Sequence, residues 1–327
     1  MAPLDDTRPA TRFDSFNVYK TSYKKIGEHE IGVAVLVPKD LKPGKHPVMV
    51  KFHGGGLVTG DALYADWISA FFVPLIHRTC SIVVLPNYRL IPEHTGADIL
   101  QDLADFWTWF HSGGVDAFLS SRHALGADKE GSSNSLISLD YTKILASGDS
   151  AGGYMALMSG LTQPRGTIKA LLAQYPMTNY LRAEPADSFF GFPPPPESVI
   201  AEHMATVEPG VVVSSATPPA RSPLSLALAL YGQYLKYFGE DEKMWPVGLV
   251  GEKESLPPTW IVHGGADSLV SVEDCRAFVD KCKGLKDGEV KLVVREGEDH
   301  GFDAEVKEDE AEWLKEGLRW VEKKWLN

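Results

Sequence analysis

The strongest constraint on the fold is the alternation of short, continuous apolar runs with longer stretches that repeat apolar residues at helical spacing. Strands buried on both faces show such unbroken runs, and helices between successive strands are typical of a parallel sheet. The predicted strands are "HPVMVKF" (46–52), "SIVVLPN" (81–87), "ILASG" (144–148), "ALLAQYP" (170–176), "TWIVHG" (259–264) and "VKLVVR" (290–295). The predicted helices cover 66–79, 97–111, 151–163, 273–283 and 305–325. We therefore predict an α/β fold with a mostly parallel sheet and helices on both faces.

Two apolar segments precede this alternation and are expected to form an antiparallel pair, "FNVYKTSYKKI" and "EIGVAVLVP". A later stretch, residues 112–140, is rich in Gly, Ser and Asp and is interpreted as a surface excursion.

A proline-rich segment interrupts the second half of the chain. It contains "FFGFPPPPES" and "ATPPARSP", and proline at this density is incompatible with the interior of a sheet. Helices at 197–207 and 224–238 are still expected there. We predict that residues 180–248 are a lid inserted into a core formed by 1–179 and 249–327.

The stretch "ILASGDSAGGYMALM" passes from a predicted strand into a predicted helix through a G-x-S-x-G pattern centred on Ser150. Glycines two residues to either side let the backbone double back, which exposes the serine hydroxyl at a helix N-terminus. Alone, the pattern also fits an N-cap serine in a glycine-rich turn. Its place between a buried strand and a helix favours a nucleophile.

A serine hydroxyl needs a base, and that base needs an orienting acid. Asp267 follows the strand "TWIVHG" and His300 follows "VKLVVR", so both are expected at the carboxyl edge of the sheet, where functional groups gather. Asp299 and Asp303 flank His300 in sequence. Asp267 is preferred as the acid because it ends its own strand and can meet the imidazole from outside that loop.

Three consecutive glycines follow a histidine in "KFHGGGLVTG" (51–60), and they require a reason because glycine loses the most backbone freedom on folding. The letters match neither a dinucleotide fingerprint nor a Walker loop, and a plain turn is the other alternative. Acyl transfer needs convergent N–H groups around a developing oxyanion. We interpret Gly54, Gly55 and Gly56 together with Ala151 as that site, and expect His53 to hydrogen-bond the glycine loop.

The order and spacing of "HGGG", "NYRLIPEH", "GDSAGG", "HGGADSLV" and "DHGF" resemble the hormone-sensitive-lipase-like branch of the α/β-hydrolase superfamily. The resemblance spans residues 53 to 302 and implies an α/β-hydrolase fold. It implies a triad of Ser150, Asp267 and His300, and oxyanion donors at Gly55, Gly56 and Ala151, with Gly54 supporting the turn. It also implies a structural network of Arg89, Glu93 and Asp102 near the site.

An aromatic lid over a serine site predicts an enclosed apolar pocket of limited depth. The residues expected to contact substrate are Leu57, Tyr154, Phe189, Phe190, Phe192 and Tyr234. We therefore expect a carboxylesterase acting on short to medium acyl chains or on compact aromatic or polyketide-like esters, with no metal and no organic cofactor.

Net charge decides which partners are disfavoured. The chain carries 32 basic and 44 acidic residues, a net charge of −12, which repels nucleic acid and anionic membranes. No signal peptide or membrane-spanning run is visible, and three cysteines lack metal-ligand spacing. We expect a cytoplasmic enzyme with a small-molecule ester substrate; a homodimer is left open.

Two other functions remain open from the sequence. A biosynthetic relative could use the same residues for acyl transfer, lactone opening or closure, or elimination. A non-catalytic small-molecule receptor is the second alternative, although recruitment of this fold to such a role loses a triad member and none is lost here.

Overall fold

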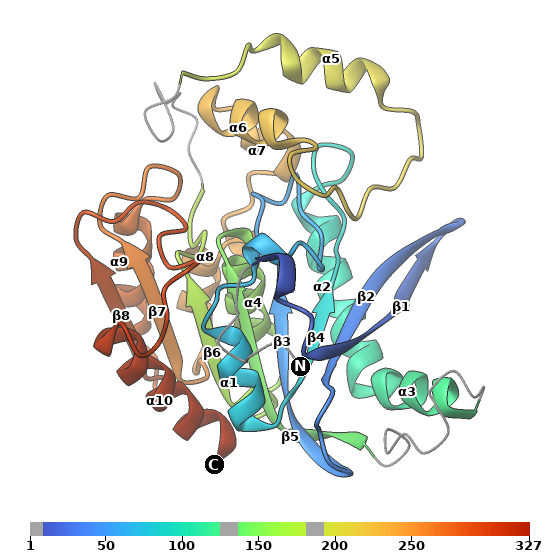
Figure 1. Ribbon diagram of the computed structural model, residues 1–327. Helices are drawn as coiled ribbons and strands as arrows, with labels where there is room; N and C mark the ends of the chain where they lie inside the picture. Colours follow the sequence, from blue (N-terminus) through green and yellow to red (C-terminus); the bar gives the residue numbers. More distant parts are fainter. Residues whose placement is uncertain (1–8, 125–136, 181–192) are drawn as a thin grey trace.

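Figure 1 shows the computed structural model, which describes residues 9–124, 137–180 and 193–327. Within these residues eight strands form one sheet in the order β1-β2-β4-β3-β5-β6-β7-β8. The strands are β1 (Phe16–Ile26), β2 (His29–Pro38), β3 (Gly44–Phe52), β4 (Ile82–Pro86), β5 (Ile137–Asp149), β6 (Ala170–Gln174), β7 (Thr259–Gly264) and β8 (Val290–Arg295). β1 and β2 pair antiparallel to each other, as predicted, and β2 pairs antiparallel to β4. All other neighbours are parallel.

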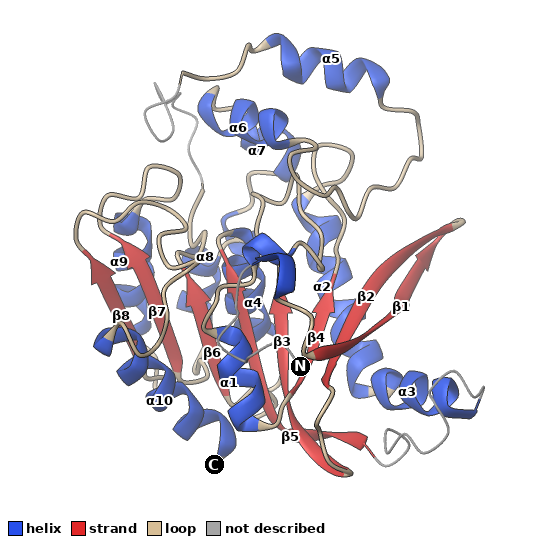
Figure 2. Cartoon of the chain, viewed as in Figure 1, coloured by secondary structure: helices blue, strands red, loops and turns tan. Residues whose placement is uncertain are grey.

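Helices cover both faces of the sheet (Figure 2). They are α1 (Phe72–Thr79), α2 (Gly96–His111), α3 (Gly114–Ala124), α4 (Ala151–Thr162), α5 (Ser198–Thr206), α6 (Ser222–Leu230), α7 (Tyr234–Phe238), α8 (Pro246–Leu249), α9 (Val272–Cys282) and α10 (Glu312–Leu326). Short 3₁₀ helices are η1 (Pro9–Thr11), η2 (Ala65–Trp67), η4 (Glu242–Met244) and η5 (Val250–Glu252). Among residues 9–124, 137–180 and 193–327, no helix is long and apolar enough to cross a membrane.

The central strands are apolar on both faces because each face packs against helices. In β4, Ile82 and Val84 join the core that contains α2, α4 and α9, whereas Val83 and Leu85 join the core that contains α1 and α10. This arrangement accounts for the unbroken apolar runs in the sequence. The predicted α/β fold with a mostly parallel sheet is confirmed.

Four predicted elements differ from the structure. The helix predicted at 66–79 is replaced by η2 and by α1, which begins only at Phe72. The stretch 112–140 was expected to be a surface excursion, but α3 begins at Gly114 and β5 begins at Ile137; α3 buries Val115 against the core. The last helix begins at Glu312, seven residues later than its predicted start at 305. The predicted helix 224–238 is divided into α6 and α7, with Gly232 at φ 64° between them.

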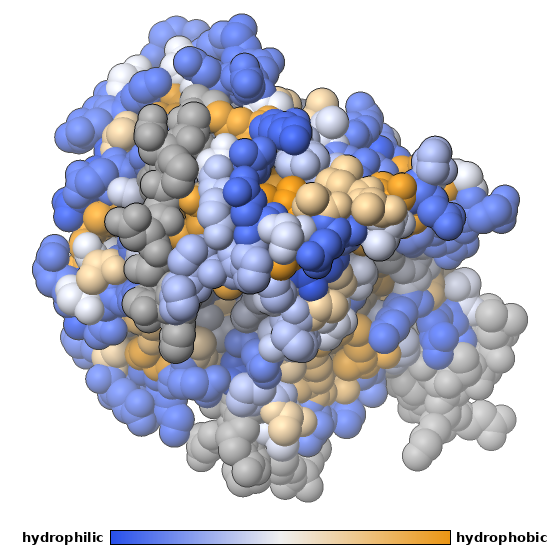
Figure 3. All heavy atoms as spheres, turned by 90° about the horizontal axis from the view of Figure 1, so that it is seen from above, coloured by the Kyte–Doolittle hydropathy of each residue, from blue (hydrophilic) through white to orange (hydrophobic). Residues whose placement is uncertain are grey.

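The carboxyl ends of the parallel strands face α5, α6 and α7, which lie above them in Figure 1. Figure 3 views this face from above and shows polar residues over most of it, with apolar residues between them toward the middle. Helices α5, α6 and α7, which come between β6 and β7 in the chain, therefore lie over the edge at which β5 ends and α4 begins.

Candidate active site

Ser150 occupies the sharp turn between β5 and α4. Its backbone has φ 54° and ψ −117°, an uncommon conformation for a residue with a side chain. The turn is possible only with little bulk nearby, since a Cβ on Gly152 would lie 2.2 Å from the carbonyl oxygen of Phe52. Such a strained strand–turn–helix is the geometry that exposes a nucleophilic serine.

His300 and Asp267 come together from two different loops. Nδ1 of His300 lies 2.8 Å from Oδ2 of Asp267, whose side chain is fully buried. The other carboxylate oxygen accepts the N–H groups of Leu269 and Val270 at 2.9 and 2.8 Å. Burial alone would raise the pKa of Asp267, but hydrogen bonds from His263 and His300 hold that pKa well below its usual value. The carboxylate is therefore ionised and fixed in orientation beside the imidazole.

The two neighbouring aspartates do not bind the imidazole of His300. Asp299 accepts the backbone N–H groups of Ser268 and His300, at 2.8 and 2.7 Å, so it holds the loop. Asp303 is fully buried and accepts a hydrogen bond from Nε2 of Gln174 at 2.9 Å. The geometry thus favours Asp267 over both flanking carboxylates.

His263 helps to hold the Asp267 carboxylate, a role that was not predicted from the sequence. Its Nε2 lies 2.9 Å from the carbonyl oxygen of Val270 and 3.3 Å from Oδ2 of Asp267. It is fully buried behind the carboxylate. A histidine at the next-to-last position of β7, four residues before Asp267, was the sequence signal that could have indicated this contact.

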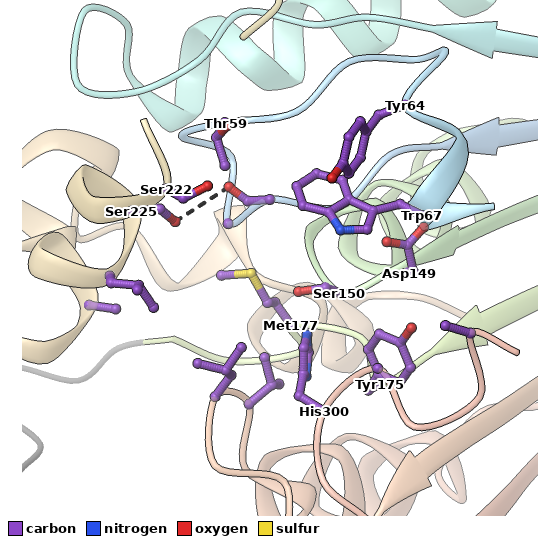
Figure 4. Close-up of a pocket in the computed structure, with 18 of the residues that line it drawn as sticks. Thr59, Tyr64, Trp67, Asp149, Ser150, Tyr175, Met177, Ser222, Ser225 and His300 are labelled. Atoms are coloured by element: carbon purple, nitrogen blue, oxygen red, sulfur yellow. Dashed lines mark hydrogen bonds between the residues drawn. The ribbon is translucent and has the colours of Figure 1, made fainter. Parts of the chain in front are cut away.

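Ser150 and His300 line the same cavity, and Figure 4 shows the imidazole of His300 close to the hydroxyl of Ser150. Within the described residues, no hydrogen bond joins the Ser150 hydroxyl to the imidazole. Nucleophile–base contacts are often long without substrate and tighten in the reacting complex.

The glycine loop follows β3 and forms another wall of the cavity. Gly55 has φ 98°, and a Cβ there would lie 2.2 Å from the carbonyl oxygen of Thr59. Gly56 has φ 63°. Both residues line the cavity, so the loop brings bare backbone to the edge of the space beside Ser150.

Hydrogen bonds to the loop carbonyls orient its N–H groups. Nδ1 of His53 lies 2.8 Å from the Gly54 oxygen, and the Gly55 oxygen accepts the N–H groups of Val58 and Thr59 at 3.1 and 3.0 Å. In a trans peptide the C=O of one residue and the N–H of the next point in opposite directions. The N–H groups of Gly55 and Gly56 therefore point away from these contacts.

These two N–H groups, and that of Ala151 at the first position of α4, donate to no acceptor among the residues that the structure describes. Burial lowers the pKa of His53, which favours a neutral ring that donates through Nδ1. The expected contact between His53 and the loop is present. Three N–H groups, two on the glycine loop and one at the start of α4, are thus left without an acceptor in the part of the chain that the structure describes.

The cavity has a volume of about 570 Å³ and a largely apolar wall. Its lining includes Trp67, Met177, Tyr180, Leu226, Ala229, Tyr234, Leu269 and Val270. Tyr234 was predicted as a substrate contact and does line the cavity. Leu57 and Tyr154 were also expected there, but both are fully buried in the core and are not part of the wall. Phe189, Phe190 and Phe192 lie outside the described residues.

Trp67 ends the short 3₁₀ helix η2, whereas Met177 and Tyr180 lie in the loop after β6. These residues were missed because no distinctive sequence pattern marks their positions. Within the described residues, no cluster of His, Cys, Asp or Glu has the arrangement of a metal site.

A buried polar layer lies beneath the nucleophile. Nζ of Lys51 donates to Oδ1 of Asp149 at 2.5 Å and to the carbonyl oxygen of Trp67 at 3.1 Å. Gln174 bridges Ser69 and Asp303. Lys51 immediately precedes "FHGGG", but no feature of the neighbouring sequence indicated that Lys51 would pair with a buried carboxylate.

The network suggested by resemblance divides into two separate groups of ion pairs. Arg89 donates to Asp102, on α2, at 2.8 Å. Glu93 instead pairs with Arg221 and His203, at 2.6 and 2.7 Å. Glu93 therefore connects the core to α5, which carries His203, and to Arg221 at the start of α6.

Sequence comparisons identify relatives of this chain. A family profile described as the alpha/beta hydrolase fold matches residues 49–194, and the BD-FAE profile matches residues 133–282. The chain is 30% identical over 331 residues to the probable carboxylesterase M8 of Phoma sp., covering 96% of this chain and 98% of that protein. It is 31% identical over 200 residues to the probable carboxylesterase clz11 of Cochliobolus lunatus, covering 58% and 86%.

The fold is also similar to that of solved esterases. Esterase 2 of Thermogutta terrifontis, in the structure phosphoramylated by tabun, superposes with a TM-score of 0.56 and 20% identity, covering 95% of this chain and 94% of that chain. The near full-length relative and the profile match establish the family. The chain belongs to the carboxylesterase-type, hormone-sensitive-lipase-like branch of the α/β-hydrolase superfamily.

Proposed function

We propose that this carboxylesterase-like enzyme hydrolyses carboxylic esters with Ser150 as nucleophile, His300 as general base and Asp267 as the acid that orients it. The observation that carries the proposal is the His300–Asp267 hydrogen bond at 2.8 Å, made at the cavity that Ser150 also lines. The strained turn at Ser150 supports the same assignment.

The reaction then follows the acyl-enzyme route. Ser150 Oγ attacks the ester carbonyl carbon while Nε2 of His300 takes its proton. The N–H groups of Gly55, Gly56 and Ala151 stabilise the oxyanion, with Gly54 shaping the turn. Collapse expels the alcohol, which takes the proton from His300. Water, deprotonated by His300, attacks the acyl-enzyme; collapse releases the carboxylic acid and returns the proton to Ser150.

The cavity supports compact substrates. A volume of about 570 Å³ with aromatic walls suits a small or medium ester rather than a long triglyceride. We propose that residues 180–248 act as a lid over it. For comparison, Thermogutta terrifontis esterase 2 has been solved with butyrate bound. The free thiols of Cys80, Cys275 and Cys282 are compatible with a reducing, cytoplasmic setting.

Covalent labelling tests the nucleophile directly. A fluorophosphonate should label Ser150, located by peptide mass spectrometry, and Ser150→Ala should abolish both labelling and turnover of p-nitrophenyl butyrate. Asp267→Asn should lower kcat by up to about 10⁴-fold, because the imidazole loses its fixed tautomer. Asp299→Asn is the matched control, since Asp299 contacts backbone and not the imidazole ring. Labelling of another serine would refute the proposal.

The same assay separates hydrolysis from acyl transfer. Both share the acyl-enzyme, so turnover is compared in water alone and with an added acceptor alcohol. Release of free butyrate as the main product supports hydrolysis. Butyryl transfer to the alcohol as the main product would favour a transferase.

A further inference from the structure

The imidazole of His300 is held by a hydrogen bond at only one of its two nitrogens. Nδ1 lies 2.8 Å from Oδ2 of Asp267, whereas no group in the described part of the chain forms a hydrogen bond with Nε2. One hydrogen bond fixes the position of one ring atom but leaves the ring free to turn about it. The side chain is 11% exposed, so the groups packed against the imidazole decide where Nε2 points.

Tyr175, the first residue after β6, packs its ring against this imidazole. The two ring centroids lie 4.4 Å apart and the ring planes are inclined by 58°, and Figure 4 shows the two rings side by side. Tyr175 lines the cavity together with Ser150 and His300, yet only 5% of its surface is exposed. Among the described residues, no other aromatic ring packs against His300.

The backbone of Tyr175 is held in a conformation that its side chain does not favour. Its φ is 36°, which is rare for a residue with a bulky side chain. Hydrogen bonds on both sides maintain this conformation. The Tyr175 N–H donates to the Val262 oxygen at 2.7 Å, and the oxygen of the preceding residue, Gln174, accepts the Ser150 N–H at 2.9 Å. A strained residue fixed so firmly beside a reacting group points to a functional role for its side chain.

The phenol of Tyr175 does not compete with His300 for protons. Burial raises the pKa of Tyr175 well above its usual value, and the neighbouring carboxyl of Asp303 raises that pKa further. The phenol is therefore neutral near pH 7 and adds no charge beside the imidazole. Its contribution to His300 is the packing of a rigid, flat ring.

We propose that Tyr175 is a positioning residue whose ring holds the imidazole of His300 in the orientation that directs Nε2 toward Ser150. The inference rests on the proposed function, in which Nε2 takes the proton of the Ser150 hydroxyl. Misplacing a reacting group by about 1 Å can lower a rate by about 10²-fold. Every ester depends on the same proton transfers through His300, so loss of the ring lowers kcat by a similar factor for all of them.

Two substitutions of Tyr175 separate its ring from its hydroxyl. Tyr175→Leu removes the ring, whereas Tyr175→Phe keeps the ring and removes only the hydroxyl. Turnover is measured with p-nitrophenyl acetate, butyrate and hexanoate. Tyr175→Leu should lower kcat for all three esters by a common factor of about 30 to 100, and Tyr175→Phe should recover most of that loss.

Tyr180→Leu is the matched comparison for a lost piece of cavity wall. Tyr180 lines the same cavity and is 8% exposed, but its ring packs against Tyr234, with centroids 4.8 Å apart. Its substitution should change mainly KM, by a factor that depends on acyl length, because it alters substrate contacts and not the base. The positioning role of Tyr175 would be overturned if Tyr175→Leu showed the same dependence on acyl length, or if Tyr175→Phe lost as much kcat as Tyr175→Leu.

Proton NMR tests the order of the imidazole without substrate. The Nδ1 proton of His300, shared with Asp267, should give a sharp resonance far downfield in the wild-type and Tyr180→Leu proteins. Tyr175→Leu should broaden this resonance, because an unsupported imidazole moves and its proton exchanges faster with water. A resonance as sharp as that of wild type would contradict the proposal.

Tyr175→Asn repeats both measurements if Tyr175→Leu does not fold, because asparagine tolerates positive φ and also lacks the ring. Wild-type kcat in this folded variant would equally overturn the role of Tyr175. Failure of the proposed function looks different, since the Ser150→Ala and His300→Ala enzymes would then retain turnover.

Discussion

Lys51 and Asp149 form an ion pair directly beneath the turn that carries Ser150, with Nζ and Oδ1 2.5 Å apart. Their side chains are 2% and 8% exposed. Lys51 also donates to the carbonyl of Trp67, on the cavity wall. The pair therefore connects β3, the end of β5 and one wall of the cavity.

Removing one member of this pair should be strongly destabilising. Lys51→Met leaves the Asp149 carboxylate buried without its partner, which typically costs about 3 to 5 kcal/mol of unfolding free energy. Chemical denaturation measures the loss. Lys51→Met/Asp149→Leu should recover much of it, because no unpaired charge remains. A Lys51→Met protein as stable as wild type would show that the pair contributes little.

Asp303 should make the free energy of unfolding fall as pH rises, whereas a salt-bridged carboxylate makes it rise. Burial raises its pKa from 3.8 to about 6. Its contribution is therefore most favourable at low pH and is lost as pH rises through about 6. Asp303→Asn removes this titration, so its stability relative to wild type should increase by about 2 kcal/mol between pH 4.5 and pH 8.

The comparison requires unfolding free energies of both proteins at each pH. Asp309→Asn, at an exposed position, serves as the control and should show no such increase. A constant difference between Asp303→Asn and wild type across this range would mean that Asp303 does not titrate there.

The two loop glycines should differ in their tolerance of alanine. A Cβ at Gly55 meets backbone, 2.2 Å from the Thr59 oxygen, whereas a Cβ at Gly56 lies 2.8 Å from the Ser225 hydroxyl. Backbone cannot move aside as easily as a hydroxyl. Gly55→Ala should raise the barrier by about 3 kcal/mol, chiefly through kcat, as loss of one oxyanion donor does.

Gly56→Ala should be milder, and Ser225→Ala should partly rescue it by removing the contacted hydroxyl. Both readouts are kcat for p-nitrophenyl butyrate. Equal losses for the two single variants, or a change of KM alone in Gly55→Ala, would contradict the assignment of the loop.

The sequence predicted those features that are marked by a recurring pattern of apolar residues or by glycines at a sharp turn. Apolar runs indicated the strands because the sheet is buried on both faces, and Gly148 and Gly152 indicated the Ser150 turn because only bare backbone fits there. The order of the motifs predicted that Asp267 and His300 would lie at the carboxyl edge of the sheet. These are local signals, and they are carried by residue type and spacing.

The cavity wall and the buried polar layer depend on long-range contacts and were not predictable in the same way. Trp67 reaches the cavity from the short 3₁₀ helix η2 and Met177 from the loop after β6, and no sequence pattern specifies such positions. Leu57 and Tyr154 are adjacent in sequence to functional residues, yet their side chains point into the core. Proximity along the chain was therefore a poor guide to the substrate wall.

The volume of the cavity predicts how activity should depend on acyl length. Each additional buried methylene contributes about 0.8 kcal/mol, or roughly a fourfold gain in kcat/KM, while apolar wall remains available. With about 570 Å³ to fill, kcat/KM for p-nitrophenyl esters should rise from acetate to butyrate or hexanoate and fall for palmitate. Ala229→Phe, on the cavity side of α6, should shift the optimum to shorter chains, whereas Glu202→Phe, at an exposed position of α5, should not. An optimum at palmitate, or a jump in rate at an emulsion interface, would identify a lipase, because long chains would then bind outside this cavity.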